Sequence, residues 1–238
     1  MEILTSVIIP VFNQWAFTKQ MLDSLFDNND MSKVAVIVVD NGSTDKTFEG
    51  VISMLQNGRP ISTICHKENL GVAKAWNAGI KFAIETFNSK YFIIMNNDIL
   101  VPKNLILNYL KCFEENSDVY AVNAYFTRRL PIPADFWKKS AEMSEQPLQI
   151  KDTWAIGGFC FGLKRETIDK IGLFDETFGR FCKEDRDYMR RMKIAGLRSV
   201  QLLNVWIHHF ENTTLNKIPN FLQHIAEVDK NYNKKWGQ

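Results

Sequence analysis

The chain has 238 residues, of which 45% are hydrophobic and 24% are charged, as expected of a folded globular protein. Its length suits one large domain, or a domain with an appendage. The formal net charge of +2 gives no strong attraction to nucleic acid, so we expect no nucleic-acid partner. No apolar run approaches the ~20 residues that a membrane-spanning helix needs.

The four cysteines, Cys65, Cys112, Cys160 and Cys182, are widely spaced and form no C-x-x-C pair. This spacing argues against a zinc site or a redox motif, so we expect reduced thiols, most of them buried. The first residues lack the basic segment that begins a signal peptide. We therefore expect a cytoplasmic protein, at most peripheral at the inner face of the membrane.

In the first half, short apolar runs alternate with stretches of helical spacing. We expect strands at residues 6–12, 33–39, 62–65 and 91–95, and helices at residues 15–28 and 72–87, with another helix after the turn at 40–45. This βαβαβαβ order is typical of a parallel sheet covered by helices, an α/β fold.

The second half is less regular. We expect helices at 102–116, 165–171, 184–195 and 219–236, and strands at 119–122, 154–163 and 200–207. The segment 127–151 contains Pro131, Pro133 and Pro147, which favours a long irregular loop, a kind of segment that often serves as a lid. The last helix would pack through Phe221, Leu222, Ile225 and Val228.

The apolar run at 91–95 ends in Asn96-Asn97-Asp98. Ligands gather beyond the carboxyl ends of such strands, and carboxylate oxygens bind hard divalent cations while phosphate fills open positions. Asp98 is therefore a candidate for a metal-bound phosphate site. A turn or helix cap is the alternative for this single residue.

Two turns, Pro10–Asn13 and Asp40–Ser43, end strands that should be neighbours and should line one crevice, where a nucleotide usually binds. The Asp40 carboxylate can accept a hydrogen bond from a base N–H, and Gly42 permits a tight turn. Plain turn chemistry is the alternative. The absence of both G-x-G-x-x-G and G-x-x-x-x-G-K-[ST] argues against a dinucleotide enzyme and a P-loop phosphotransferase.

Two further groups can carry chemistry. Glu184, Asp185 and Asp187 begin a predicted helix, where a carboxylate can act as a general base, although acids also simply favour a helix N-terminus. His208 and His209 end a predicted strand. Either imidazole can bind a divalent metal, and a structural histidine is the alternative.

Together these residues resemble the family 2 glycosyltransferases of the GT-A fold, from about Thr5 to Thr214. The matching segments, in order, are residues 6–13, 38–45, 68–71, 77–79, 95–98, 157–159, 164–166, 171–176, 184–187 and 209–214. The resemblance implies one catalytic domain over residues 1–238, with a mostly parallel central sheet and helices on both faces. Its parts would be a nucleotide-binding half (1–101), an acceptor-binding half (102–214) and a C-terminal helix (215–238).

The resemblance also assigns roles to residues. Asp98 would bind Mn²⁺ or Mg²⁺ and bridge the donor diphosphate, although Asn96 replaces the first acid of the family's D-x-D motif. The N-N-D form is similar to rhamnosyltransferase-like members and favours dTDP-rhamnose as donor, with UDP-sugars next. Residues expected to bind the nucleotide or donor are Pro10, Val11, Phe12, Asn13, Asp40, Gly42, Asn69, Gly71, Asn77, Asn96 and Asn97, with Gly157 and Gly158 as the floor of the sugar site.

For the base, the resemblance favours Asp185, with Glu184 as the alternative. For the metal or diphosphate it favours His209 over His208, because the family spacing then continues at Asn212 and Thr214. In the family a glycine often follows this histidine, and this chain has Glu211 and Asn212 there instead.

The implied activity is inverting, metal-dependent transfer to a hydroxyl of a glycan or lipid-linked acceptor, in surface polysaccharide synthesis. The main alternative is a silent nucleotide-sugar-binding scaffold, and a nucleotidyltransferase fits less well. The acceptor would contact residues 127–151 and the C-terminal helix. Aromatic residues such as Phe136, Trp137 and Trp154 could stack on sugar or belong to the core. Lys230, Lys234, Lys235 and Trp236 could touch an anionic membrane, or form a solvated helix end.

Overall fold

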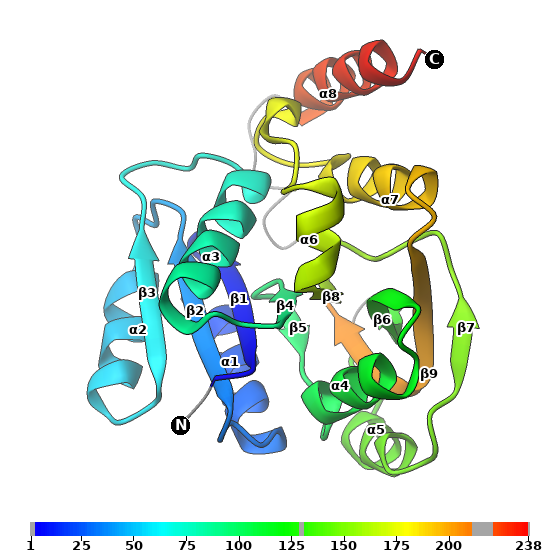
Figure 1. The fold of residues 1–238 in the computed structure, drawn as a ribbon. Helices are drawn as coiled ribbons and strands as arrows, with labels where there is room; N and C mark the ends of the chain where they lie inside the picture. The colour runs from blue at the N-terminus through cyan, green and yellow to red at the C-terminus, as the bar shows by residue number, and fades with distance from the viewer. Residues whose placement is uncertain (1–2, 129–130, 211–220, 238) are drawn as a thin grey trace.

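The computed structural model describes residues 3–128, 131–210 and 221–237 (Figure 1). Within this part of the chain, one nine-stranded sheet runs through the molecule in the order β3-β2-β1-β4-β8-β6-β9-β5, with β7 paired to β9. The strands are β1 (Thr5–Val11), β2 (Val34–Asp40), β3 (Ile61–Cys65), β4 (Tyr91–Met95), β5 (Ile99–Leu100), β6 (Val119–Arg128), β7 (Ile150–Asp152), β8 (Cys160–Lys164) and β9 (Arg198–His209).

Helices cover the sheet on both faces. They are α1 (Trp15–Asn28), α2 (Thr47–Gln56), α3 (Val72–Phe87), α4 (Leu105–Glu115), α5 (Phe136–Ser144), α6 (Arg165–Ile171), the short 3-10 helix η1 (Glu176–Phe178), α7 (Glu184–Ile194) and α8 (Phe221–Trp236).

The first half has the predicted parallel order. β1 pairs in parallel with β2 and β4, and β2 pairs in parallel with β3. All seven residues of β2 are buried, because helices cover both faces of this part of the sheet. The near-continuous apolar run at 33–39 is the sequence feature that this double burial requires.

The second half joins the sheet mainly by antiparallel pairing. β8 pairs antiparallel with β4 and β6, while β9 pairs in parallel with β6. The two-residue strand β5 pairs antiparallel with β9, which places Ile99 opposite His209. This pairing brings the residue after Asp98 to the end of the last strand of the sheet.

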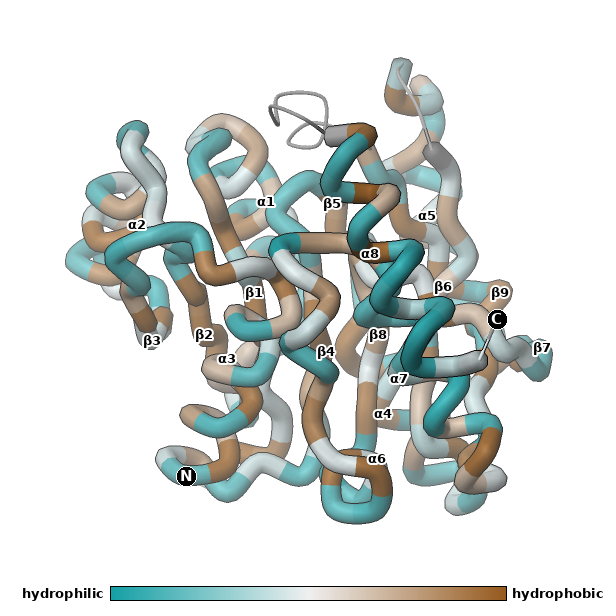
Figure 2. Tube along the Cα trace, turned by 90° about the horizontal axis from the view of Figure 1, so that it is seen from above, coloured by the Kyte–Doolittle hydropathy of each residue, from teal (hydrophilic) through white to brown (hydrophobic). Residues whose placement is uncertain are grey.

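Two apolar layers lie on the two faces of the sheet. Successive residues of β1 alternate between them, because neighbouring strand residues point to opposite faces. Val7 and Ile9 pack in one layer with α1 and α4, and Ile8 packs in the other with α3 and α7. Figure 2 shows the apolar residues gathered along the strands, whereas α8 is largely hydrophilic.

The prediction of an irregular segment at 127–151 was wrong in its middle. Helix α5 forms there, and Phe136 at its start is completely buried against Trp206 of β9, with ring centroids 5.1 Å apart. The three prolines, at 131, 133 and 147, lie outside the helix. They obscured a short helix whose stability comes from a tertiary contact rather than from its own sequence.

Other predicted boundaries differ less from those of the structure. The strand expected at 154–163 begins only at Cys160, so Gly157 and Gly158 lie in a loop. Of the cysteines, Cys112 and Cys160 are buried, Cys182 is half-buried and Cys65 is exposed, so the expectation that most are buried is only partly met.

The C-terminal helix is present, with a different packed face from the one expected. Val228 is buried, but Leu222 is 80% exposed. Pro219, the predicted helix start, lies outside the described residues, as do Glu211, Asn212 and Thr214. In the part of the chain that the structure describes, no helix is both long and apolar enough to cross a membrane.

Candidate active site

A cavity of about 560 Å³ opens at the carboxyl ends of β1 and β4, where the strand order predicts a ligand. Four segments that are distant in sequence contribute the polar and apolar residues of interest to its walls. They are Pro10, Val11 and Phe12 after β1, Asn96, Asn97 and Asp98 after β4, Glu184 and Asp185 at the start of α7, and His209 at the end of β9. We call this space the first cavity.

Asp98 and His209 lie together in the first cavity. The β5–β9 pairing holds them there, with the Phe210 N–H donating to the Asp98 carbonyl at 3.0 Å. His209 Nε2 is 3.3 Å from Asp98 Oδ1, and both side chains are about nine-tenths buried. The Phe159 ring stacks on the imidazole with centroids 4.4 Å apart, which fixes the plane of the ring.

His208 lies in a different environment, because adjacent strand residues point to opposite faces. Its buried ring packs against Phe136 and Phe210, and Nδ1 lies 3.3 Å from the Thr127 hydroxyl. Burial lowers the pKa of His208, which keeps the ring neutral. The geometry therefore separates the two histidines, and only His209 lines the first cavity.

The Asp98–His209 pair has the chemistry of a partial metal site. A carboxylate and an imidazole are both ligands of first-row divalent cations. Among residues 3–128, 131–210 and 221–237, no cluster of three or more His, Cys, Asp or Glu side chains is arranged to hold a metal by itself. The pair therefore fits a cation whose other positions are filled by ligand oxygens or water, and does not fit an all-protein cage.

The two asparagines before Asp98 differ in their surroundings. The Asn97 side chain donates to the Thr18 hydroxyl of α1 at 2.9 Å, which fastens the end of β4 to that helix. The Asn96 N–H donates to the Phe159 carbonyl at 2.7 Å, and its side chain lines the cavity. Asn96 is therefore the better placed of the two to meet a ligand.

The turn after β2 uses most of its polar groups internally. Asp40 Oδ1 accepts from the Ser43 N–H at 2.8 Å, and Asn13 Oδ1 accepts from the Thr44 N–H at 2.7 Å. Gly42 has φ +83°, and an added Cβ would lie 2.6 Å from the backbone of Glu68. Neither Asp40 nor Asn13 lines the first cavity. These contacts favour the turn alternative for Asn13, and base binding by Asp40 stays a prediction.

Asn41 is a cavity residue that sequence reasoning missed. Its side chain donates to Asn69 Oδ1 at 3.0 Å and to the Gly71 carbonyl at 3.2 Å, and accepts from the Leu70 N–H at 3.1 Å. It therefore holds the turn before α3 against the turn after β2. Asn69 also lines the first cavity, as expected. The one sequence feature that could have indicated Asn41 as a cavity residue is its position directly after Asp40.

Asn77 does not face the first cavity. It is buried in α3, where its amide donates to the Phe174 carbonyl at 2.9 Å and to Glu176 Oε1 at 2.8 Å, and accepts from the Phe174 N–H at 3.0 Å. These bonds join α3 to the segment before α7. Its geometry is that of a structural anchor rather than of a ligand contact.

Glu184 and Asp185 occupy the start of α7. Burial, followed by repulsion from Asp185, raises the pKa of Glu184 to about 8. Burial also raises the pKa of Asp185, but the N–H groups of Arg186 and Gly158 oppose this by donating to its carboxylate, the Arg186 bond being 2.7 Å long. At neutral pH, Glu184 holds its proton more firmly, and Asp185 ionises first.

Gly158 lies against the Asp185 carboxylate. A Cβ at this position would lie 3.1 Å from Asp185 Oδ2, and one at Gly157 would lie 2.3 Å from the Phe159 ring. Larger residues here would push on the carboxylate or on the ring that stacks on His209. Positions 157 and 158 therefore require small residues because the Phe159 ring and the Asp185 carboxylate lie so close to them.

A second cavity of about 1000 Å³ adjoins the first. The two share Asn96, Gly158, Asp185, Arg186 and His209. Asp185 therefore stands at the junction, where groups bound in the two cavities would meet. We call this space the second cavity.

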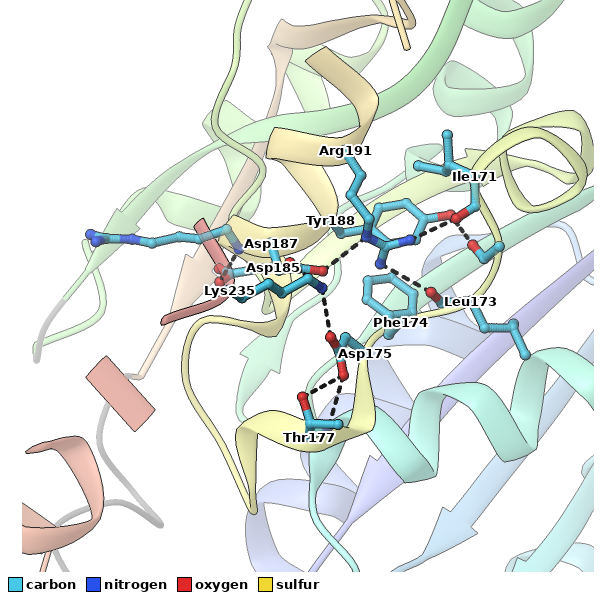
Figure 3. Close-up of polar contacts among 12 residues, drawn as sticks. Ile171, Leu173, Phe174, Asp175, Thr177, Asp185, Asp187, Tyr188, Arg191 and Lys235 are labelled. Carbon is cyan, nitrogen blue, oxygen red and sulfur yellow. Dashed lines mark hydrogen bonds and ion pairs between the residues drawn. The ribbon is translucent and has the colours of Figure 1, made fainter. Parts of the chain in front are cut away.

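Helix α8 forms part of both cavities, and it is the C-terminal helix that was expected to contact the acceptor. Ile225 and Asp229 line the first cavity, and Tyr232 lines the second. Figure 3 shows how the helix is held at its end: Lys235 Nζ lies 2.6 Å from Asp187 Oδ1 and 2.5 Å from Asp175 Oδ2. Lys235 therefore binds the protein itself, contrary to the idea that it is free to contact a membrane.

Comparisons with known proteins show the family to which the chain belongs. The family described as "Glycosyl transferase family 2" matches residues 6–172, and the chain belongs to this family. An uncharacterized glycosyltransferase of Rickettsia bellii is 34% identical over 120 residues, which is 50% of this chain. The matched part is only 16% of that relative's length.

Two solved structures share the fold, which is the GT-A fold. The mannosyltransferase PcManGT from Pyrobaculum calidifontis, in complex with GDP-Man and Mn²⁺, has a TM-score of 0.68 and 21% identity, covering 97% of this chain and 65% of its own. GalNAc-T7 with UDP, GalNAc and Mn²⁺ has a TM-score of 0.71 and 12% identity, covering 96% of this chain and 48% of its own.

Proposed function

We propose that this protein transfers a sugar, with inversion, from a nucleotide diphosphate donor to a hydroxyl group of a glycan or lipid-linked acceptor. One observation carries the proposal: Asp98 lies in the first cavity alone, with His209 beside it, and Asp185 lies where that cavity meets the second. A leaving diphosphate and an attacking hydroxyl need this separation. On this proposal residues 1–238 act as one domain, with 1–101 holding the donor and 102–214 most of the acceptor.

The donor would bind in the first cavity. Pro10, Val11 and Phe12 would contact the base and ribose, with Asn69 nearby, and Gly71 and Gly42 shaping the turns beneath. The GDP-Man bound to PcManGT, and the UDP and GalNAc bound to GalNAc-T7, support a donor of this class. The N-N-D form of Asn96, Asn97 and Asp98 favours dTDP-rhamnose, and then a UDP-sugar.

Asp98 and His209 would hold Mn²⁺ or Mg²⁺ together with the diphosphate oxygens. A bound cation would stabilise the negative charge that develops on the leaving diphosphate. Phe159 keeps the His209 ring in its plane, and the β5–β9 pairing fixes its distance from Asp98. Pre-positioned ligands of this kind cost no reorganisation during the reaction.

Asp185 would act as the base. As the acceptor oxygen bonds to the anomeric carbon, the bond from that carbon to the diphosphate breaks and the hydroxyl proton passes to the Asp185 carboxylate. The hydroxyl arrives from the second cavity, opposite the departing group, so the anomeric configuration inverts. The N–H groups of Arg186 and Gly158 orient the Asp185 carboxylate and oppose the rise in its pKa that burial causes. Glu184 is the alternative base.

A silent nucleotide-sugar-binding scaffold is the second candidate. It is favoured by Asn96, which supplies no charge at the first acid position, and by the small number of protein ligands for a metal. Both candidates bind nucleotide, so transfer separates them. The enzyme candidate includes a role in surface polysaccharide synthesis, as in the resemblance described above.

The test is a thermal-shift panel of GDP, UDP and dTDP and their sugars, with Mn²⁺ or with EDTA, followed by measurement of released nucleotide diphosphate. We expect at least one nucleotide to raise Tm only with Mn²⁺, because binding to the native state stabilises it. Asp98→Ala should abolish this shift, and Asp169→Asn, on the exposed surface of α6, should keep it. Binding without any transfer favours the scaffold, and no nucleotide binding rejects both candidates.

A further inference from the structure

The second cavity carries a row of positive charge. Arg186, Arg190 and Lys193 lie four and three residues apart on α7, which places them on one face of the helix, and all three line the cavity. No acidic side chain in the described part of the chain forms an ion pair with any of them. Asp185 is the one carboxylate among the lining residues.

Other cations near this region are neutralised by the protein. Arg191, on another face of α7, binds Asp187 Oδ2 at 2.9 Å and donates to the carbonyls of Ile171 and Leu173. Lys183 pairs with Asp229 of α8 at 2.7 Å. Arg190 and Lys193 differ from these two cations in having no acidic partner among the described residues. Arg186, in contrast, lies beside the Asp185 carboxylate and attracts it.

Aromatic rings support two of the three cations. The Arg190 guanidinium lies 4.4 Å from the centroid of the Trp236 ring, and Lys193 Nζ lies 5.5 Å from that of Trp154. Contacts of this kind hold a cation in place without cancelling its charge. Both cations are therefore held beside the second cavity, which Arg190 and Lys193 line.

The same cavity contains flat apolar surface for a sugar ring. Trp154 is 52% exposed, and Phe126 and Tyr232 also line the space. The exposed face of an indole ring offers a flat apolar surface on which a sugar ring can pack. The cavity therefore combines surfaces for a sugar with surfaces for an anion.

We propose that the second cavity is an acceptor subsite for a glycan that carries phosphate, with Arg186, Arg190 and Lys193 binding the phosphoryl oxygens and Trp154 packing on a sugar. This rests on the proposed function, because it names the acceptor of that reaction. Arginine meets phosphate with two parallel hydrogen bonds, and lysine binds it as a point charge. The row spans about 10 Å at 1.5 Å per residue, which suits a diphosphate or successive phosphates better than one carboxylate.

The test measures binding of four probes to the full chain with Mn²⁺ and nucleotide. They are undecyl N-acetylglucosaminide, the same sugar joined to undecanol through a diphosphate, the same sugar joined to glycerol through a phosphodiester, and undecyl glucuronide. We expect at least one of the two phosphate probes to bind at least tenfold more tightly than the neutral probe. If only the undecyl diphosphate binds more tightly than the neutral probe, the recognised phosphate belongs to a lipid carrier. If the glycerol phosphodiester binds equally tightly, the recognised phosphate belongs to the glycan.

The variant Arg190→Gln/Lys193→Gln should lose the tenfold preference and keep nucleotide binding. Lys81→Gln/Lys111→Gln removes the same charge from exposed positions outside both cavities and should keep the preference. Lys193→Gln alone, at an exposed position, provides a milder test if the double variant folds poorly.

Three outcomes would overturn the proposal. They are equal binding of the neutral and phosphate probes, a preference for phosphate that survives in the double variant, and a glucuronide that binds as tightly as the phosphate probes. Loss of nucleotide binding in the wild type would instead reject the proposed function.

Discussion

The two sides of the first cavity use polar residues in different ways. On the β1–β2 side, Asn13, Asp40 and Asn41 bond mainly to neighbouring backbone or to other amides. On the β9–α7 side, Asp185 and His209 present their side chains to the cavities. The β1–β2 side therefore determines the shape of the site, while the β9–α7 side supplies its charged and ionisable groups.

The strongest test of this contrast is at Asp185. We expect Asp185→Asn to lower transfer by about 10²–10⁴-fold, because the amide cannot take a proton, and to leave nucleotide binding unchanged. Steady-state transfer and nucleotide titration of the same variant would measure both. Glu184→Gln is the matched comparison: if it causes the greater loss of transfer, Glu184 is the base.

Next in size is the ion pair under α8. Asp187 is completely buried between Arg191, Lys235 and the Trp236 N–H. We expect Asp187→Ala to lower the free energy of unfolding by about 3 kcal/mol, because the half-buried Arg191 and Lys235 lose their buried partner. Urea unfolding measures this.

The control is the exposed pair of Asp118 and Arg198, 3.0 Å apart. Asp118→Ala should cost under about 1 kcal/mol, because water screens this pair. Equal losses in the two variants would show that α8 does not depend on the buried pair.

A pH effect should come from Glu184. Its folded pKa of about 8 lies above the ordinary 4.5, so the folded state holds a proton that the unfolded state releases between these values. Stability should therefore fall as pH rises from about 5 to 8, by roughly 2 kcal/mol. Urea unfolding at several pH values would show the decline, and Glu184→Gln should remove it; an equal decline in that variant would assign it to other groups.

The smallest expected difference concerns two glycines with positive φ. Gly71 has φ +96°, and an added Cβ would lie 2.6 Å from the Gly179 carbonyl, whereas Gly58 has φ +89° with open space around it. Each change to alanine costs about 1 kcal/mol for the backbone conformation. Gly71→Ala should lower the free energy of unfolding by about 1 kcal/mol more than Gly58→Ala, because the backbone at Gly179 must shift to admit the Cβ. Thermal unfolding compares the two, and identical losses would rule out the clash.

The sequence alone determined the parallel half of the fold and the order of the site segments. Apolar strands that end in turns are local patterns, so residues 6–12, 33–39 and 91–95 could be placed without the structure. The same locality made Asp98, the acids at 184–187 and the two histidines candidates, and the family resemblance favoured Asp185 and His209 among them. Their meeting at the cavities follows from strand order, which α/β topology largely prescribes.

Only the tertiary structure decided the remaining features. Helix α5 depends on Phe136 reaching Trp206, seventy positions away in the sequence. The roles of His208 and His209 separate because one faces apolar side chains and the other faces Asp98. Lys235 reads as a solvated terminal charge until α8 is seen against Asp187. In each case the partner is remote along the chain, and burial, rather than any local pattern, fixes what the side chain contacts.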